Sequence, residues 1–273
     1  MGMVEKLFDE FAALPQIEAI ALGGSRAGEV YDKKSDYDVY LYCTSAIEED
    51  VRLCILEKYC SFMEIGNHFW EYEDNCVLKN GIDIDILYRD LDSFAENVAS
   101  VVEQYQACNG YTTCMWHNLK TCKIIYDRDG RLQAVKDRFS MPYPKQLKEN
   151  IISKNMKLIS DAMPAYPLQI AKAVERKDLV SIGHRTAAFM ESYFDIIWAM
   201  NELTHPGEKR LVSLCKKQCS VLPANFEENI NQLYADLFTD LDSVGEDVAR
   251  IICELKKVIS GRQIDVIRND NHS

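Results

Sequence analysis

Hydrophobic positions follow different periods in the two halves of the chain. Up to about residue 141, short apolar runs with the two-residue alternation of β-strands are interleaved with helical stretches. The predicted strands lie at about 17–22, 35–42, 82–88 and 122–126, and two short extended pieces are expected within 68–79. The predicted helices of this half lie at about 3–14, 46–61 and 91–107, with a further short helix just before residue 122. The first half therefore predicts a sheet with helices around it.

After Pro142 and Pro144 the hydrophobic period becomes that of helices, and no strand pattern follows. The predicted helices of this half lie at about 144–162, 166–176, 178–204, 208–219, 224–240 and 244–260. The polar residues from about 262 onward are expected to fray. We therefore predict an α+β protein, with a mixed β-sheet domain flanked by helices at residues 1–141 and an all-α helical bundle at residues 142–273.

The stretch from Gly23 to Tyr42 carries the strongest chemical signal. The first predicted strand runs directly into Gly23-Gly24-Ser25, where the absence of Cβ atoms lets the backbone approach a ligand closely. If a helix opens at Ser25, its free N–H groups and the positive end of its dipole would point at the same place. This arrangement suits a phosphate group.

The next predicted strand contains Asp36 and Asp38, whose side chains share one face because strand side chains alternate. Their Cα atoms lie about 6–7 Å apart in a strand. Two unit charges about 6 Å apart repel each other by roughly 3 kcal/mol at an effective dielectric constant of 20. A cation between the carboxylates would relieve this repulsion, and Mg²⁺ prefers oxygen ligands. The segment therefore indicates a phosphate cradle beside a Mg²⁺ site.

A third acidic position is expected in the strongly alternating segment Ile82 to Tyr88, which follows the turn signal Asn80-Gly81. Asp83 and Asp85 share one face of this strand. A half-exposed strand without any function alternates in the same way, so the pattern taken alone favours a structural role.

The run G-G-S followed at short range by D-x-D resembles the signature of the DNA polymerase β-like nucleotidyltransferase superfamily. It is most similar to the small bacterial members, which include the aminoglycoside and lincosamide antibiotic nucleotidyltransferases. The resemblance implies an N-terminal nucleotidyltransferase domain and a C-terminal helical domain that helps to shape the acceptor pocket. It also implies that Gly24 and Ser25 hold the nucleotide triphosphate, and Gly23 and Arg26 match the signature less closely.

In this superfamily two aspartates bind Mg²⁺, and a third acid on a later strand acts as general base or further metal ligand. The resemblance assigns these roles to Asp36, Asp38 and Asp85, with two Mg²⁺ ions expected. Asp85 is preferred because the Ile-Leu-Tyr-Arg-Asp that follows it resembles the strand ending of relatives, and Asp83 is the alternative. The implied reaction transfers an NMP, with AMP from ATP as the first candidate, to a hydroxyl of a small acceptor and releases pyrophosphate.

Lys209 is a further candidate ligand of the triphosphate or of the acceptor. Pro206-Gly207 ends one predicted helix, so Lys209 and Arg210 would lie in the first turn of the next. A cation at this position interacts unfavourably with the helix dipole, at a cost of about 0.3–1 kcal/mol. This cost suggests that one of the two residues binds a ligand. A solvated turn between helices explains the same residues equally well.

Composition limits the partners. The net charge of −12 argues against nonspecific nucleic-acid binding, which needs a basic surface. The N-terminus lacks a signal-peptide pattern, and no apolar run is long enough to span a membrane. The ten cysteines are scattered, as in a cytoplasmic protein with reduced thiols.

Two alternatives to a small-molecule acceptor stay open. The acceptor of the nucleotide could instead be a protein side chain or an RNA end. A member without catalytic activity could act as a nucleotide-binding or toxin–antitoxin partner. The sequence does not name the acceptor, does not fix the NTP or the oligomeric state, and leaves antibiotic resistance as an association only.

Overall fold

The computed structural model describes residues 2–27, 35–69 and 71–270, with the backbone alone for Ser25 and residues 262–270. The chain forms two compact units. Unit 1 contains the residues up to Ser100 together with Met115–Pro142, and unit 2 contains Val101–Cys114 together with the residues from Tyr143 onward. Unit 2 therefore includes a short segment from within the range that the sequence assigns to the first domain.

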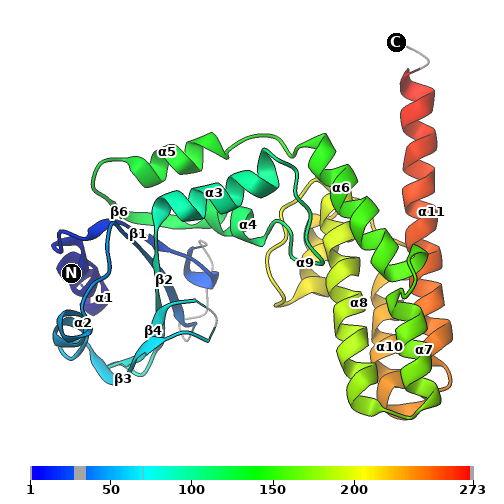
Figure 1. Cartoon of the computed structure of the whole chain (residues 1–273), viewed down its shortest axis with the longest axis horizontal. Helices are drawn as coiled ribbons and strands as arrows, with labels where there is room; N and C mark the ends of the chain where they lie inside the picture. The colour runs from blue at the N-terminus through cyan, green and yellow to red at the C-terminus, as the bar shows by residue number, and fades with distance from the viewer. Residues whose placement is uncertain (1, 28–34, 70, 271–273) are drawn as a thin grey trace. The chain divides into compact units, whose positions relative to one another are not determined.

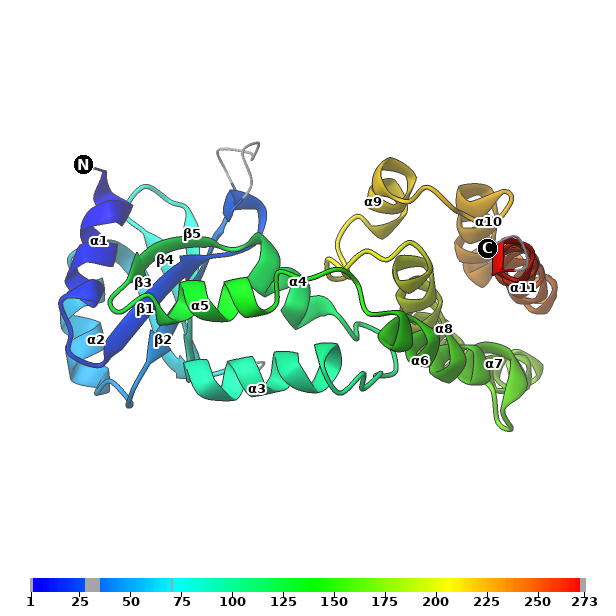
Figure 2. The same ribbon diagram turned by 90° about the horizontal axis from the view of Figure 1, so that it is seen from above.

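Unit 1 is built on a mixed six-stranded sheet with the order β3-β4-β5-β2-β1-β6 (Figures 1 and 2). The strands are β1 Ile17–Leu22, β2 Tyr37–Cys43, β3 Cys60–Asn67, β4 Glu73–Leu78, β5 Asp83–Arg89 and β6 Lys123–Asp127. Strand β2 pairs with β5 in parallel, whereas the pairs β1–β2, β1–β6, β3–β4 and β4–β5 are antiparallel.

The sheet has two faces that differ in character. The rear face carries Val39, Ile84 and Ile86, which are buried in one apolar cluster with the helix α1, Met3–Ala12. Helix α2, Glu49–Leu56, packs on the same side through Ile55 and Leu56. The front face carries the residues that alternate with these, Asp38 and Asp85 among them.

Helices of the second layer cover part of the front face. They are α3 Leu91–Val102, α4 Cys114–Thr121 and α5 Arg131–Arg138. Phe94 of α3 packs edge-on against Tyr42, with 5.6 Å between the ring centroids. Asn118 of α4 donates a hydrogen bond of 2.6 Å to the hydroxyl of Tyr40. These helices therefore cover the end of β2 that lies beyond Asp38.

Unit 2 is helical around α8, Leu179–Met200, whose C-terminal half is buried on almost all sides. Its other helices are α6 Lys145–Met156, α7 Tyr166–Glu175, α9 Leu211–Gln218, α10 Phe226–Thr239 and α11 Val244–Asp270, with a short π-helical turn at Lys157–Asp161 (Figure 1). Within the described ranges no helix combines the length and the apolar character needed to cross a membrane.

The predicted α+β fold class, a mixed sheet with flanking helices followed by a helical region, is confirmed. Three local predictions were wrong and one helix was missed. Of the two extended pieces expected within 68–79, the described residues form one, β4, whereas β3 lies before this range. The helix predicted for 46–61 ends at Leu56, and its last two residues belong to β3. Helix α5 was not predicted at all. Helix α11 continues to Asp270, ten residues beyond the predicted end at 260.

Candidate active site

Two of the predicted acids lie side by side on the front face. The parallel register of β2 and β5 makes Asp38 and Asp85 direct Cα partners. Neighbouring strands lie about 4.8 Å apart, and partner side chains project to the same face. Both residues are half-buried. The register therefore builds a pair of adjacent carboxylates from two segments that are far apart in the sequence.

The Gly23-Gly24 turn is pressed against Asp38. The backbone N–H of Gly23 donates a 2.8 Å hydrogen bond to the carbonyl of Asp38. Gly24 has a φ of +57°, and a Cβ atom added there would lie 1.8 Å from Oδ2 of Asp38. At Gly23 an added Cβ would lie 2.4 Å from the ring of Tyr40. A side chain at Gly23 would displace the ring of Tyr40, and one at Gly24 would displace the Asp38 carboxylate in a backbone conformation that favours glycine.

The structure corrects one part of the phosphate argument. The turn continues into Ser25–Ala27, a single 3₁₀ turn of three residues, and not into a helix. So short a turn has little dipole, and any contribution to phosphate binding would come from individual N–H groups. The side chain of Ser25 lies outside the described structure, as do residues 28–34 between this turn and β2.

Arg26 braces the entry to β2. Its Nε donates to the carbonyl oxygens of Ser35 at 2.6 Å and Asp36 at 3.1 Å. Its guanidinium lies over the ring of Tyr37, with 3.8 Å from Cζ to the centroid, and the residue is buried. In this conformation Arg26 orders the segment that carries the acids.

Asp36 and Asp83 lie at the margins of the carboxylate pair. Asp36 immediately precedes β2, and Asp83 begins β5 as an exposed residue opposite Val77. Across the described residues no group of three or more His, Cys, Asp or Glu side chains is placed to hold a metal ion. The three predicted acids therefore do not form one tight cluster in this structure, whereas Asp38 and Asp85 form a pair.

Strand β4 adds two front-face residues that were not predicted from the sequence, Glu73 and Asn75. Asn75 lies opposite Asp85, and its Nδ2 donates a 2.8 Å hydrogen bond to Oδ1 of Asp85. Glu73 is buried, and this burial raises its pKa, with the charge of Asp85 acting in the same direction. The sequence did contain a signal for Asn75, because a hairpin with its turn at Asn80-Gly81 places Asn75 opposite Asp85.

The arginine of β5, Arg89, forms an ion pair with an acid outside the carboxylate pair. Arg89 forms a two-point pair with Glu71, at 2.7 Å from Nε to Oε2 and 2.6 Å from Nη2 to Oε1. Its guanidinium also lies over the ring of Tyr40, with the centroid 4.0 Å from Cζ. The charge of Arg89 is therefore largely balanced by Glu71.

Lys209 lies in unit 2, and its predicted setting was wrong. Helix α9 begins at Leu211, so Lys209 is an exposed residue of the preceding turn and not of the first helical turn. The turn is anchored by the buried His205, whose backbone N–H donates to Oγ1 of Thr113 at 2.8 Å. Because Lys209 lies outside the helix, the argument from the helix dipole no longer supports a role for Lys209 in ligand binding.

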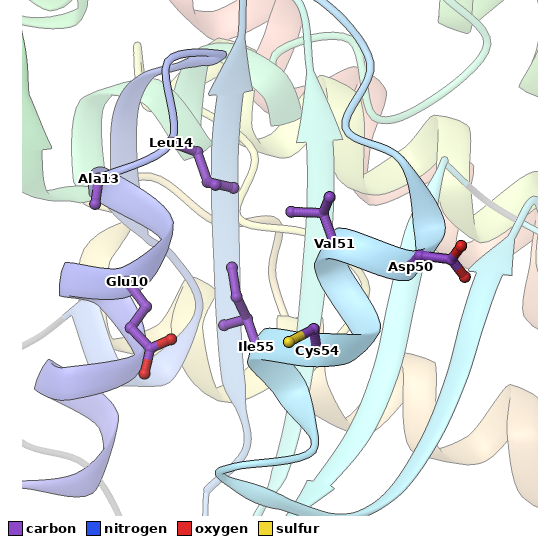
Figure 3. Close-up of a pocket in the computed structure, with 7 residues that line it drawn as sticks. All are labelled: Glu10, Ala13, Leu14, Asp50, Val51, Cys54 and Ile55. Atoms are coloured by element: carbon purple, nitrogen blue, oxygen red, sulfur yellow. The ribbon is translucent and has the colours of Figure 1, made fainter.

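A shallow apolar hollow of about 450 Å³ lies between α1 and α2, on the rear side of the sheet (Figure 3). It is lined by Glu10, Ala13, Leu14, Asp50, Val51, Cys54 and Ile55. Because Asp38 and Asp85 project to the opposite face, this hollow does not belong to the candidate active site.

Comparison with known proteins gives one family match. A family described as "Domain of unknown function (DUF4037)" matches residues 112–210, little more than a third of the chain. The matched range does not include Asp38 or Asp85. No curated protein matches the chain.

Several solved structures are similar at low identity. A nucleotidyltransferase-like protein from Exiguobacterium sibiricum 255-15 is 9% identical, covering 95% of this chain and 75% of that one, with a TM-score of 0.42. An aminoglycoside 6-adenyltransferase from Bacillus subtilis is 10% identical, with 94% and 90% covered and a TM-score of 0.30. A Thermotoga maritima CCA-adding enzyme in complex with tRNA is 9% identical, with 96% and 81% covered and a TM-score of 0.29.

Proposed function

We propose that the protein is a Mg²⁺-dependent nucleotidyltransferase that moves an NMP from an NTP to a hydroxyl group of a small acceptor. The proposal rests above all on the register that makes Asp38 and Asp85 partners beside Gly24. Paired carboxylates next to a glycine turn whose backbone lies directly against them suit a metal ion and a nucleotide tail. The G-G-S and D-x-D pattern of the sequence supports the same assignment.

The residues present fit Mg²⁺. Protein sites commonly bind this ion through one or two carboxylates and leave its other positions to waters and substrate phosphates. Asp38 and Asp85 supply such a pair, and Asp36 would join them when nucleotide and metal bind. When bound, Mg²⁺ would stabilise the negative charge that develops on the phosphate oxygens, and a second ion would share this task.

The protein groups would divide the remaining work. Backbone N–H groups around Gly23 and Gly24, with Ser25, would hold the β- and γ-phosphates. Arg26 is a candidate to balance charge on the leaving pyrophosphate after release from its carbonyl partners. Lys209 keeps only the weaker support of being an exposed cation.

The proposed reaction is an in-line substitution at the α-phosphorus. The acceptor hydroxyl oxygen forms a bond to phosphorus while the bond to the bridging oxygen of the pyrophosphate breaks. Asp85 either completes the metal site or takes the hydroxyl proton, and the second role requires a distance of about 2.6–3.2 Å between the two oxygens. ATP is the first candidate donor. Hydroxylated antibiotics are the first acceptors to test, with a protein or RNA acceptor as the alternative.

The test is pyrophosphate release from each NTP with Mg²⁺ and a panel of hydroxylated small molecules, antibiotics included. We expect turnover that a chelator abolishes. Asp38→Asn and Asp85→Ala should each lower turnover by about 100-fold or more, because a metal ion contributes several kcal/mol to the transition state.

Asp83→Ala is the matched control, because it removes an exposed aspartate of the same strand two residues away. Its turnover should stay close to that of the wild type. Retained turnover in Asp38→Asn would contradict the metal site. A larger loss in Asp83→Ala than in Asp85→Ala would move the third acid to Asp83. Nucleotide binding without pyrophosphate release would favour the noncatalytic alternative.

A further inference from the structure

A row of hydrogen-bonded amides crosses the front face from β5 to the sheet edge at β3. Asn75 donates to Oδ1 of Asp85 at 2.8 Å, and its own Oδ1 accepts from Nδ2 of Asn67 at 2.7 Å. The Nδ2 of Asn67 also lies 3.3 Å from Oε2 of Glu64. Because Asn67 donates to the oxygen of the Asn75 amide, the nitrogen of that amide must face Asp85. The row therefore fixes the orientation of both ends of Asn75.

A bulge in β3 makes this reach possible. Glu64 pairs with Asn75, and Asn67 pairs with Glu73. Two residues of β3, Ile65 and Gly66, thus oppose a single residue of β4. Such a bulge re-aims the side chains that follow it and is common beside active sites. Here it returns Asn67 to the front face, within reach of Asn75.

The bulge is held from the rear face by buried charges. Gly66 has a φ of +75°, and its N–H donates a 2.8 Å hydrogen bond to Oδ1 of Asp74. Asp74 forms an ion pair with Arg52, and neither side chain is exposed to solvent. The hydroxyl of Tyr88 donates to Oδ2 of Asp74 at 2.7 Å. A rigid rear cluster therefore sets the position of a front-face amide.

We propose that Asn75 is a positioning residue that holds one oxygen of Asp85 and leaves the other free to bind metal or acceptor. This inference rests on the proposed function. A neutral amide suits the task, because it orients the carboxylate without cancelling its charge. A lysine or arginine at position 75 would compete with the metal ion for Asp85.

The experiment measures Mn²⁺ binding to the full chain by electron paramagnetic resonance during titration with MnCl₂, without nucleotide. Asn75→Leu removes both amide functions at similar size and should raise the Mn²⁺ dissociation constant by about 10- to 100-fold, as loss of partners around metal ligands does. Asn67→Leu should raise it less. Asn97→Leu, at an exposed position on α3, is the control and should leave it unchanged.

A second readout separates positioning from general damage. With turnover established, Asn75→Leu should lower kcat while the KM for the nucleotide changes less, because the base is misplaced while the phosphate turn is intact. If the wild type binds Mn²⁺ and Asn75→Leu has the same Mn²⁺ dissociation constant, the inference about Asn75 is overturned, whereas the proposed function is not. Equal absence of binding in the wild type and in Asp38→Asn would overturn the proposed function and this inference with it. If Asn75→Leu does not fold, Asn67→Leu provides the test instead. A Mn²⁺ dissociation constant of Asn67→Leu equal to that of the wild type would then overturn the inference.

Discussion

Two aspartates on neighbouring strands meet opposite surroundings on the two faces of the sheet. Asp74 points to the rear face, is fully buried and is saturated by Arg52, Tyr88 and the backbone of Gly66. Asp85 points to the front face, is half-buried and accepts from the neutral amide of Asn75. Both residues are acids in β-strands, and the alternation of the sequence alone does not distinguish the structural acid from the functional one.

The difference shows how to separate a structural carboxylate from a functional one. A buried charge with a charged partner and filled acceptor positions stabilises the fold only while that partner is present. A carboxylate that is oriented by a neutral donor, beside a second carboxylate, keeps its charge for a ligand. The rear cluster should therefore govern stability and the front pair should govern ligand binding.

The largest expected effect tests the rear cluster. Arg52→Leu should lower the free energy of unfolding by about 3–5 kcal/mol, because it leaves the buried Asp74 charge without its cation. Urea denaturation followed by circular dichroism measures this loss. Glu49→Gln is the control: Glu49 lies 3.8 Å from Arg52 with a side chain that is 70% exposed, so the change should be within about 0.5 kcal/mol. Equal stabilities of the two variants would remove the contrast between the faces.

Unit 2 offers a third kind of environment in Asp195, which is buried and surrounded by neutral donors. It accepts from the N–H and hydroxyl of Thr112, at 3.1 and 2.7 Å, and from Nδ2 of Asn155 at 3.1 Å. Burial raises the pKa of Asp195 to about 6, and these hydrogen bonds lower it in part. The charge of Asp195 acts on the side chains of Cys114 and Tyr143, which belong to the same unit.

The expected pH effect follows from this raised pKa. Between about pH 4 and pH 6 the folded protein keeps a proton on Asp195 that the unfolded chain has released. Stability from this group is therefore full below about pH 4 and is lost as the pH rises through about 6, by about 3 kcal/mol. Asp195→Asn should reduce this loss of stability with rising pH. Melting temperatures of both proteins, measured by thermal unfolding across this pH range, test the prediction. Parallel plots of melting temperature against pH would contradict the raised pKa of Asp195.

The smallest expected effect concerns the stability of the front pair. Asp38→Asn removes one of two adjacent negative charges, so the melting temperature should stay nearly unchanged or rise slightly. The change in unfolding free energy should be within about 1 kcal/mol, far from the loss in Arg52→Leu. Differential scanning calorimetry without divalent ions provides the measurement. A marked loss of stability would mean that Asp38, like Asp74, serves the fold.

Much of this architecture could be predicted because it is local. The alternation in β2 and β5 fixed which acids share a face, and helical periods after Pro144 predicted the helices of unit 2. The glycine turn directly after the first strand could also be read from the sequence. The local pattern did not determine the lengths of α2 and α11, because helix ends carry only weak local signals.

The sequence by itself determined the faces of the strands, the helical second half and the acids available for chemistry. The tertiary structure decided which acids meet: pairing of β2 with β5 in one register chose Asp85 over Asp83 as the neighbour of Asp38. It also supplied Asn75 and the bulge at Gly66. The reason is physical, because alternation acts along one strand, whereas register is set by side-chain packing between strands that are distant in sequence.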